Sequence, residues 1–364
     1  MAITSTIRAV ILAVSATGLA LSAPFAAARG GKCHDGKADA IRLSGREISI
    51  IPQLTEALGN FEKEGVKVEL VADTVFEGPH YRMQRALNRC EIDMSVHWFQ
   101  HIFYGHAHNE PTVALMMFNG APGLTIMVPN RVKDKVRSAA DFHDLKVAEG
   151  MGYSTKSIIM NLLASRAGLP PRSYTPILSA PEGRLEATLK ALDSGEVDVI
   201  AFREPQTSAI RATNRVSVIY DLTTPARTRK VLGAEYPAQT LFAAPDFLNE
   251  HPEQVQRVVN AFVRTMHFVN THGADEIAAA MPAYFEGKDK EKEVALIRAQ
   301  MPSYAAGKFG FKEDHAMLMQ RAIDNAQYDD TVEGNFRALA RQRQIPARRL
   351  FDNRFVDRAM KSVR

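Results

Sequence analysis

The stretch that decides the fold is Ile51–Val71, which reads IPQLTEALGNFEKEGVKVELV. Gln53–Glu64 is predicted to be a helix that ends at Gly65, since glycine commonly follows the last helical turn. In Val66–Val71 apolar and polar side chains alternate with period two, which is typical of a half-buried strand. A short apolar run, Ile48–Ile51, precedes the helix and is predicted to be a strand. Strand, helix and strand in this order predict an α/β fold.

Strand and helix signals alternate in the same way along most of the chain. From His251 onward apolar residues recur at helical spacing, which predicts a long helical tail. The alternation predicts an α/β fold with a largely parallel sheet. The other predicted strands are 93–96, 112–118, 124–128, one ending at 147, 174–178, 197–202, 216–221 and 240–244, and the other predicted helices are 81–88, 155–168 and 183–194.

The first 28 residues have the layout of a secretory signal peptide. Met1–Arg8 carries one cation, residues 9–23 are uncharged and apolar, and Ala26–Ala28 supplies the small residues that signal peptidase requires. The apolar run is too short for a membrane span, which disfavours a retained anchor. We expect an exported, periplasmic protein that begins at or near Arg29, and the remaining length suits two domains.

Cys33 and Cys90 are the two cysteines of the chain. A pair of cysteines in an exported protein often forms one disulfide, and we predict a bridge between them. The sequence does not show that the two residues meet, so two free thiols stay open as the alternative. Two thiols are too few for a cysteine-based zinc or iron–sulfur site.

Several segments together resemble a known family. The segment G-x-F-E-K-E-G lies at 59–65, and further segments follow it: RALNRCEIDMSV, VRSAADFHDLKVAEGMGYST, ALDSGEVDVIAFREP and FLNEHPEQV. In order and spacing they resemble the periplasmic solute-binding proteins for sulfonate, nitrate, taurine and thiamine-type pyrimidines. The resemblance covers about Ile48–Val255, and members of that family usually carry glycine at the position of Cys90.

The resemblance implies a fold and a set of partners. It implies the type II periplasmic binding protein fold, with two α/β lobes, two crossover strands and a helical C-terminal tail. Lobe 1 is expected over residues 40–130 and 225–364, and lobe 2 over residues 131–224. The implied partners are a small-molecule solute bound between the lobes and an inner-membrane ABC permease with its cytoplasmic ATPase. A monomer without cofactor and without a nucleic-acid partner is expected.

Candidate binding residues follow from the strand ends. In open α/β sheets ligands gather beyond the carboxyl ends of the strands. The residues predicted there offer amides, hydroxyls, one tryptophan and charges of both signs, which suits a small, polar, anionic organic solute. They are Gln53, Glu77, His97, Trp98 and Asn119 from lobe 1, and Gly152, Tyr153, Ser154, Thr155, Arg203 and Glu204 from lobe 2.

The glycine-rich turn at 150–155 has three interpretations. It half-matches a dinucleotide fingerprint, but Thr155 replaces the third glycine and the expected downstream acid is missing. An anion seat is predicted instead, formed by N–H groups and hydroxyls at a helix N-terminus. Ordinary helix capping by Ser154 or Thr155 is the alternative. Arg203 is predicted to clamp the anion as a guanidinium fork, with an ion pair to Glu204 as the alternative.

Other classes of function receive less support. His97 and His101 have i,i+4 spacing, but no acidic cluster accompanies them, so no metal site is predicted. The sequence has no G-x-S-x-G elbow, Walker loop or H-E-x-x-H motif, so we predict a binding protein and not an enzyme. A sensor or chaperone-like module, a binder of a thiamine-type pyrimidine and a same-fold enzyme of pyrimidine synthesis stay open as alternatives.

Overall fold

The computed structural model describes residues 40–72, 82–150, 154–177, 184–325 and 345–363. All of them fall within one compact unit, Lys32–Arg364. The predicted signal peptide lies outside the described residues, as do Cys33, Glu77, Gly152 and Tyr153. None of the described helices is both long enough and apolar enough to cross a membrane.

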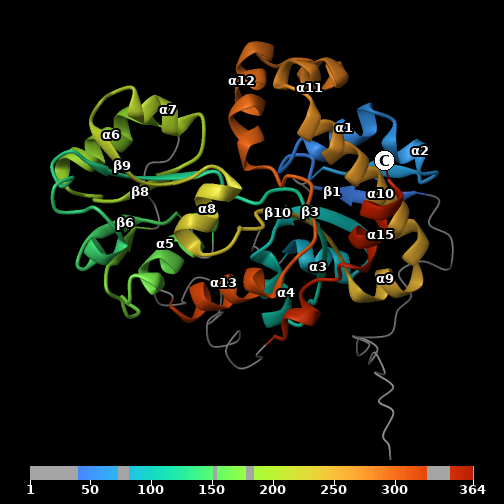
Figure 1. Ribbon diagram of the computed structural model, residues 1–364, viewed down its shortest axis with the longest axis horizontal. Helices are drawn as coiled ribbons and strands as arrows, with labels where there is room; N and C mark the ends of the chain where they lie inside the picture. The colour runs from blue at the N-terminus through green and yellow to red at the C-terminus, as the bar shows by residue number, and fades with distance from the viewer. Residues whose placement is uncertain (1–39, 73–81, 151–153, 178–183, 326–344, 364) are drawn as a thin grey trace, which may run out of the picture. The chain divides into compact units, whose positions relative to one another are not determined.

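The largest sheet has five strands, four from the N-terminal third of the chain and one, β10, from further along it (Figure 1). Its order is β2-β1-β3-β10-β4, in which β1, β2 and β3 are parallel and β10 runs antiparallel to both of its neighbours. Strands β1, β2, β3 and β4 therefore run in the same direction, as the prediction of a largely parallel sheet requires, and β10 runs against them because it returns from the second half of the chain. The strands are β1 (Ile41–Ser44), β2 (Val68–Leu70), β3 (Met94–Trp98), β4 (Val113–Met117) and β10 (Gln239–Ala243).

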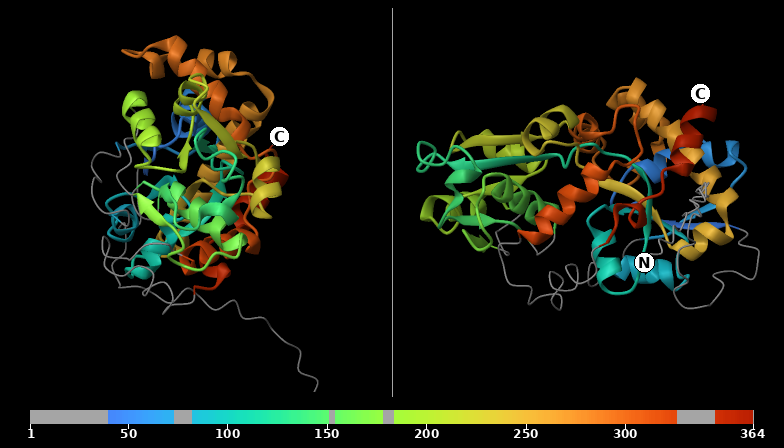
Figure 2. Two further views of the ribbon diagram at one scale, coloured as in Figure 1. Left: turned by 90° about the vertical axis from the view of Figure 1, so that its left-hand side faces the viewer. Right: turned by 60° about the horizontal axis from the view of Figure 1, so that its bottom comes forward.

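Two smaller sheets follow in the middle of the chain. Strands β5 (Leu124–Pro129), β8 (Ile200–Phe202) and β9 (Val216–Leu222) form an antiparallel sheet of order β8-β5-β9. Strands β6 (Lys146–Ala148) and β7 (Thr175–Ile177) form a parallel pair. Figure 2 shows β5 and β9 side by side. The chain thus passes from the five-stranded sheet to the second sheet between β4 and β5, and returns between β9 and β10.

Helices alternate with these strands and then form the C-terminal part of the chain. The apolar stripe predicted after His251 is confirmed, because Val255, Val258, Phe262 and Met266 of α10 are fully buried. Helix α10 packs against α1, α2 and α15 (Figure 1). The helices are α1 (Ile51–Ala57), α2 (Asn60–Lys63), α3 (Arg82–Asn88), α4 (His101–Ala107), α5 (Thr155–Arg166), α6 (Leu185–Ser194), α7 (Gln206–Arg211), α8 (Pro225–Leu232), α9 (Pro245–Glu250), α10 (Pro252–Thr271), α11 (Ala274–Ala280), α12 (Lys290–Gln300), α13 (Glu313–Asp324) and α15 (Arg354–Ser362), with 3₁₀ turns η2 (Ala139–Phe142), η3 (Pro282–Phe285), η4 (Met301–Ser303) and η5 (Ala347–Arg349).

The first strand lies earlier than predicted. It is β1 at Ile41–Ser44, and the predicted strand Ile48–Ile51 instead leads into α1. Gly45 turns the chain with a φ of 113°, and its carbonyl accepts hydrogen bonds from the N–H groups of Ile48 and Ser49. A side chain at Gly45 would collide with Val96 of β3, so this close turn requires glycine. The apolar run is buried as the start of a helix and not as a strand.

The helix predicted at Gln53–Glu64 is two helices. Gly59 has a φ of 65°, a left-handed conformation that interrupts the helical hydrogen-bond ladder between α1 and α2. Gly65 ends the second helix with the same left-handed φ of 65°, as predicted. The first glycine of the G-x-F-E-K-E-G segment is therefore a break between helices, and the last is a helix end.

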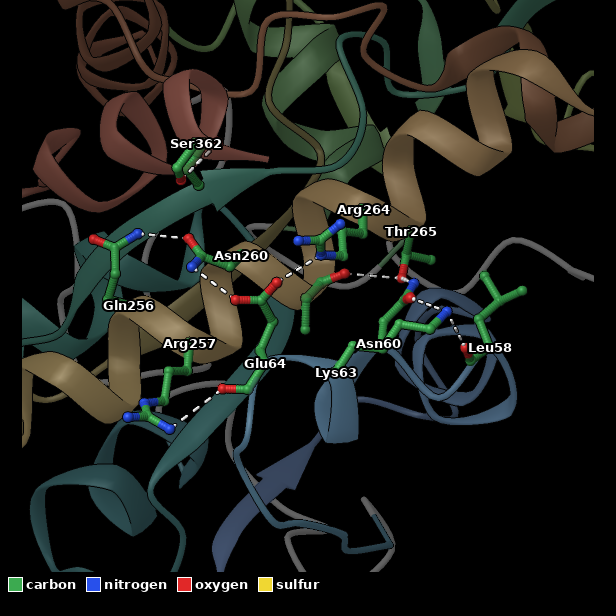
Figure 3. Close-up of polar contacts among 12 residues, drawn as sticks. Leu58, Asn60, Lys63, Glu64, Gln256, Arg257, Asn260, Arg264, Thr265 and Ser362 are labelled. Atoms are coloured by element: carbon green, nitrogen blue, oxygen red, sulfur yellow. Dashed lines mark hydrogen bonds and ion pairs between the residues drawn. The ribbon is translucent and has the colours of Figure 1, made fainter. Parts of the chain in front are cut away.

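The G-x-F-E-K-E-G segment is fixed to α10 by polar contacts (Figure 3). Glu64 Oε1 accepts a hydrogen bond of 2.6 Å from Arg264 Nε, and Glu64 Oε2 accepts one of 2.9 Å from Asn260 Nδ2. One turn away, Asn60 Nδ2 donates to Thr265 Oγ1 over 3.0 Å. This Glu64 clamp, made of Glu64, Arg264 and Asn260, joins residues about 200 positions apart in the sequence.

Candidate functional site

The ends of β3 and β8 bring a tryptophan and an arginine together. The guanidinium carbon of Arg203 lies 4.7 Å from the centroid of the Trp98 ring. Arg203 Nε also donates a hydrogen bond of 2.9 Å to the carbonyl oxygen of Pro122. A cation–π contact is worth ~0.5–1 kcal/mol when exposed and about 2 kcal/mol when desolvated, so the stack orients the cation. Both residues were predicted site residues, and the structure places them in contact.

Beside this pair lies a buried network of an amide and two hydroxyls. Gln100 Nε2 donates to Thr155 Oγ1 over 3.2 Å, and the Tyr236 hydroxyl donates to Gln100 Oε1 over 3.4 Å. Tyr236 is fully buried, and Gln100 and Thr155 are nearly so. Burial raises the pKa of Tyr236, while the nearby positive charge of Arg203 and the hydrogen bond with Thr155 act in the opposite direction. The hydroxyl therefore stays protonated at neutral pH and keeps its hydrogen bond to Gln100.

The network reaches the first turn of α5. Ser154 is the N-cap of this helix, and its Oγ accepts a hydrogen bond of 3.2 Å from the Ser157 N–H. The same hydroxyl donates to the backbone oxygen of Glu149 over 2.8 Å. The capping interpretation is thus confirmed for Ser154, whose hydroxyl serves the helix. Thr155, the first helical residue, instead points its hydroxyl at Gln100.

Behind the α5 N-terminus lies a buried acid. Glu149 follows β6 directly, and its side chain is fully buried. Its Oε1 accepts a short hydrogen bond from the Tyr174 hydroxyl, which also lies 3.3 Å from Asn161 Oδ1 of α5. Burial raises the pKa of Glu149 to about 8, and the contacts with Tyr174 and Ser157 oppose that rise only in part. The carboxyl group is therefore mainly neutral at pH 7.

Two predicted amides carry buried acceptor atoms. Gln53 lies in α1, and its Oε1 is buried and has no hydrogen-bond partner among the described residues. Asn119 follows β4, where its Nδ2 donates to Ser303 Oγ over 2.8 Å, while its Oδ1 is buried and unpaired in the described part of the chain. A buried acceptor without a donor costs free energy, so each oxygen suits a donor from a ligand or water.

The remaining predicted residues have structural contacts. His97 Nδ1 accepts from the Trp98 N–H over 2.9 Å, and its ring lies 4.3 Å from that of His101. In the described ranges, no group of three or more His, Cys, Asp or Glu side chains is arranged to hold a metal ion. Glu204 Oε2 accepts from the Ser208 N–H over 3.0 Å, so this carboxylate bonds to the first turn of α7.

Comparison with known proteins adds to this geometry. A family model described as NMT1/THI5 like matches residues 53–275. The chain belongs to the NMT1/THI5-like family. This confirms the family resemblance expected from the sequence. A search of curated proteins gives no match.

Solved structures show the fold of this NMT1/THI5-like chain. A protein from Bordetella bronchiseptica RB50 is 23% identical with a TM-score of 0.63, over 89% of this chain and 98% of that chain. The periplasmic aliphatic sulphonate binding protein SsuA from Escherichia coli is 17% identical with a TM-score of 0.56, over 79% and 86%. The periplasmic nitrate-binding protein NrtA from Synechocystis PCC 6803 is 12% identical with a TM-score of 0.59, over 89% and 88%. The chain has the two-lobe periplasmic binding protein fold, as expected.

Cys90 departs from the glycine expected in the family resemblance, and the backbone explains that preference. Cys90 follows α3 with a φ of 59°, in the left-handed region that favours glycine. The residue is disulfide-bonded. Its expected partner, Cys33, lies outside the described residues, so this pairing stays a prediction.

Three residues of the site were missed from the sequence of the NMT1/THI5-like chain. Gln100 and Tyr236 were not selected because neither directly follows a predicted strand: Gln100 lies four residues after the strand 93–96, and Tyr236 lies before the strand 240–244. Glu149 was quoted within the turn but received no role. A usable signal exists for Glu149, because an acid inside the buried segment Val147–Gly150 has to be neutralised or paired.

Proposed function

We propose that this chain is the solute-binding component of an ABC importer, exported to the periplasm, and that it captures a small organic anion between its two lobes. The proposal includes the predicted lobes, 40–130 with 225–364 and 131–224, a monomeric state, and an inner-membrane permease with its ATPase as partner. Support comes from the family and from the structural similarity to a sulphonate-binding and a nitrate-binding periplasmic protein.

One observation carries the choice of an anion. Arg203 is held on the face of Trp98 and acts electrostatically on Tyr236, whose hydroxyl donates to Gln100; the amide of Gln100 in turn donates to Thr155 at the start of α5. A guanidinium group binds carboxylate and sulfonate oxygens in two-point geometry, and a helix N-terminus adds N–H donors and a partial positive charge. Each hydrogen bond to a charged group contributes ~1.5–3 kcal/mol. The aromatic ring would contact the apolar part of an organic solute.

A second candidate rests on a different observation. The unpaired acceptor oxygens of Gln53 and Asn119, which the described residues leave without donors, would suit the amino group of a thiamine-type pyrimidine. Such a ligand would not require Arg203. The two candidates therefore differ in how binding responds to the loss of that side chain.

Calorimetry on protein refolded from denaturant, which removes co-purified solute, tests the choice. The probes are ethanesulfonate, nitrate, benzoate and a 4-aminopyrimidine. We expect an anion to bind, Arg203→Ala to weaken it at least about tenfold, as the loss of one charged hydrogen bond requires, and the exposed Arg211→Ala control to bind as the wild type does. Binding of the aminopyrimidine alone, with the same affinity in Arg203→Ala, would favour the second candidate and contradict the anion proposal.

A further inference from the structure

Glu149 connects three elements behind the first turn of α5. Its backbone oxygen accepts the Ser154 hydroxyl, and its carboxyl group accepts the Tyr174 hydroxyl from the segment before β7. The Tyr174 hydroxyl also donates to Asn161 Oδ1 of α5 over 3.3 Å. Glu149 thus fixes the helix that presents Thr155 to the candidate site.

The surroundings of the carboxyl group are neutral at physiological pH. Tyr174 and Ser157 are the groups that act on it, and Asn161 joins them through Tyr174. The Ala148 N–H donates to the carbonyl oxygen of Val199, which directly precedes β8, and the residues of β8 are apolar and buried. Lys156, in the first turn of α5, places its Nζ 5.0 Å from the Phe202 ring centroid. Within the described residues, the pKa of Glu149 responds to burial, Tyr174 and Ser157, so a negative charge there would be stabilised by two hydroxyl groups.

We propose that Glu149 is a positioning residue that works as an uncharged acid, holding the first turn of α5 so that Thr155 and the helix N–H groups face the bound anion. The inference rests on the proposed anion-binding function. Ionisation of Glu149 would oppose anion binding in two ways. It would place a negative charge behind the helix N-terminus that receives the anion, and it would leave a charged carboxylate buried beneath the first turn of α5, which costs free energy.

The pH dependence has a definite sign. Because the pKa of Glu149 is raised to about 8, the carboxyl is neutral below this pH and ionised above it. Anion affinity is therefore retained on the acid side and falls as pH rises through about 8. His315 does not interfere, since burial lowers its pKa to about 4 and it stays neutral from pH 6.5 to 9.

The experiment compares wild type, Glu149→Gln and a control, Glu186→Gln, which removes an exposed acid at the start of α6. Ethanesulfonate, nitrate and benzoate affinities are measured from pH 6.5 to 9 at constant ionic strength. We expect wild type and control to lose affinity on the order of tenfold across this range, as a like charge at partly screened distance predicts. Glu149→Gln keeps a side chain of the same shape with an acceptor oxygen but has no ionisable proton, so its anion affinity should not change between pH 6.5 and 9.

Hydrogen exchange of the Ser157 and Ile158 amides, which bond to Ser154, provides a readout that needs no solute. Their protection, corrected for intrinsic exchange, should fall above pH 8 in wild type and not in Glu149→Gln. If amide protection differs in this way between wild type and Glu149→Gln but none of the three anions binds, the role of Glu149 is supported and the anion proposal is contradicted. Anion binding with identical pH profiles in wild type and Glu149→Gln would overturn the role of Glu149 and leave the anion proposal standing.

Discussion

The Glu64 clamp gives a prediction whose size follows from the structure. Glu64→Ala removes the carboxylate that accepts from Arg264 Nε at 2.6 Å and from Asn260 Nδ2 at 2.9 Å. The Glu64 side chain is 11% exposed and that of Arg264 is 35% exposed, so solvent screens the ion pair only in part. Two hydrogen bonds to a charged group contribute ~3–6 kcal/mol before screening, and the exposed side of Arg264 reduces that sum.

We expect Glu64→Ala to lower the free energy of unfolding by about 2–4 kcal/mol. Urea unfolding followed by far-UV circular dichroism measures it, and an unchanged m-value shows that the comparison is valid. Glu62→Ala is the matched control, because Glu62 lies in the same short helix and is exposed, and it should change stability by no more than about 0.5 kcal/mol.

A double-mutant cycle with Arg264→Ala isolates the pair. The cycle should give a coupling free energy of at least about 1 kcal/mol between the two positions, since contacting charged residues are not additive. If Glu64→Ala is no more destabilising than Glu62→Ala, or if the cycle shows no coupling, the clamp does not hold the G-x-F-E-K-E-G segment to α10 and our reasoning is refuted.

Three other predictions concern the site and the chain ends. Arg203→Ala should shift the emission of Trp98, the single tryptophan, even without solute, whereas Arg203→Lys should keep part of the wild-type spectrum; identical spectra in all three proteins would show that the stack does not form in solution. Free-thiol counting under denaturing, non-reducing conditions should find none, because Cys33 and Cys90 are expected to pair, and two reactive thiols per chain would exclude the bridge. N-terminal sequencing of exported protein should start at or near Arg29, and an intact Met1 would rule out the signal peptide.

The sequence predicted the parts of the fold that depend on periodicity. The apolar stripe of α10 and the positions of most strands along the chain follow from the spacing of apolar residues, because these segments are buried along one face. Strand β1 was missed because its Arg42 reads as a polar position, while the downstream run Ile48–Ile51 reads as apolar. In the structure the Arg42 guanidinium donates to the Asp93 carboxylate and to the Cys90 carbonyl oxygen. These bonds offset the cost of placing a charged side chain in a strand.

The candidate site was predictable only where a residue's chemistry is visible by itself. Trp98, Thr155 and Arg203 were selected because they follow predicted strands and carry functional groups that bind solutes. Gln100 and Tyr236 meet only through the return of the chain into β10, a contact across more than a hundred residues that no local pattern encodes. Tertiary pairing, and not propensity, decides such networks.

The measurement that tests the central proposal most directly is small-angle scattering with and without a saturating probe, after calorimetry has shown which anion binds. A solute that contacts both lobes, Trp98 on one side and Thr155 and Arg203 on the other, binds the closed state better, as hinge closure requires. Moving the equilibrium from 1:99 to 99:1 needs about 5.5 kcal/mol of differential affinity, which a few charged hydrogen bonds can supply. We predict a smaller radius of gyration with the bound anion. An unchanged radius at saturation would contradict capture by closure of two lobes.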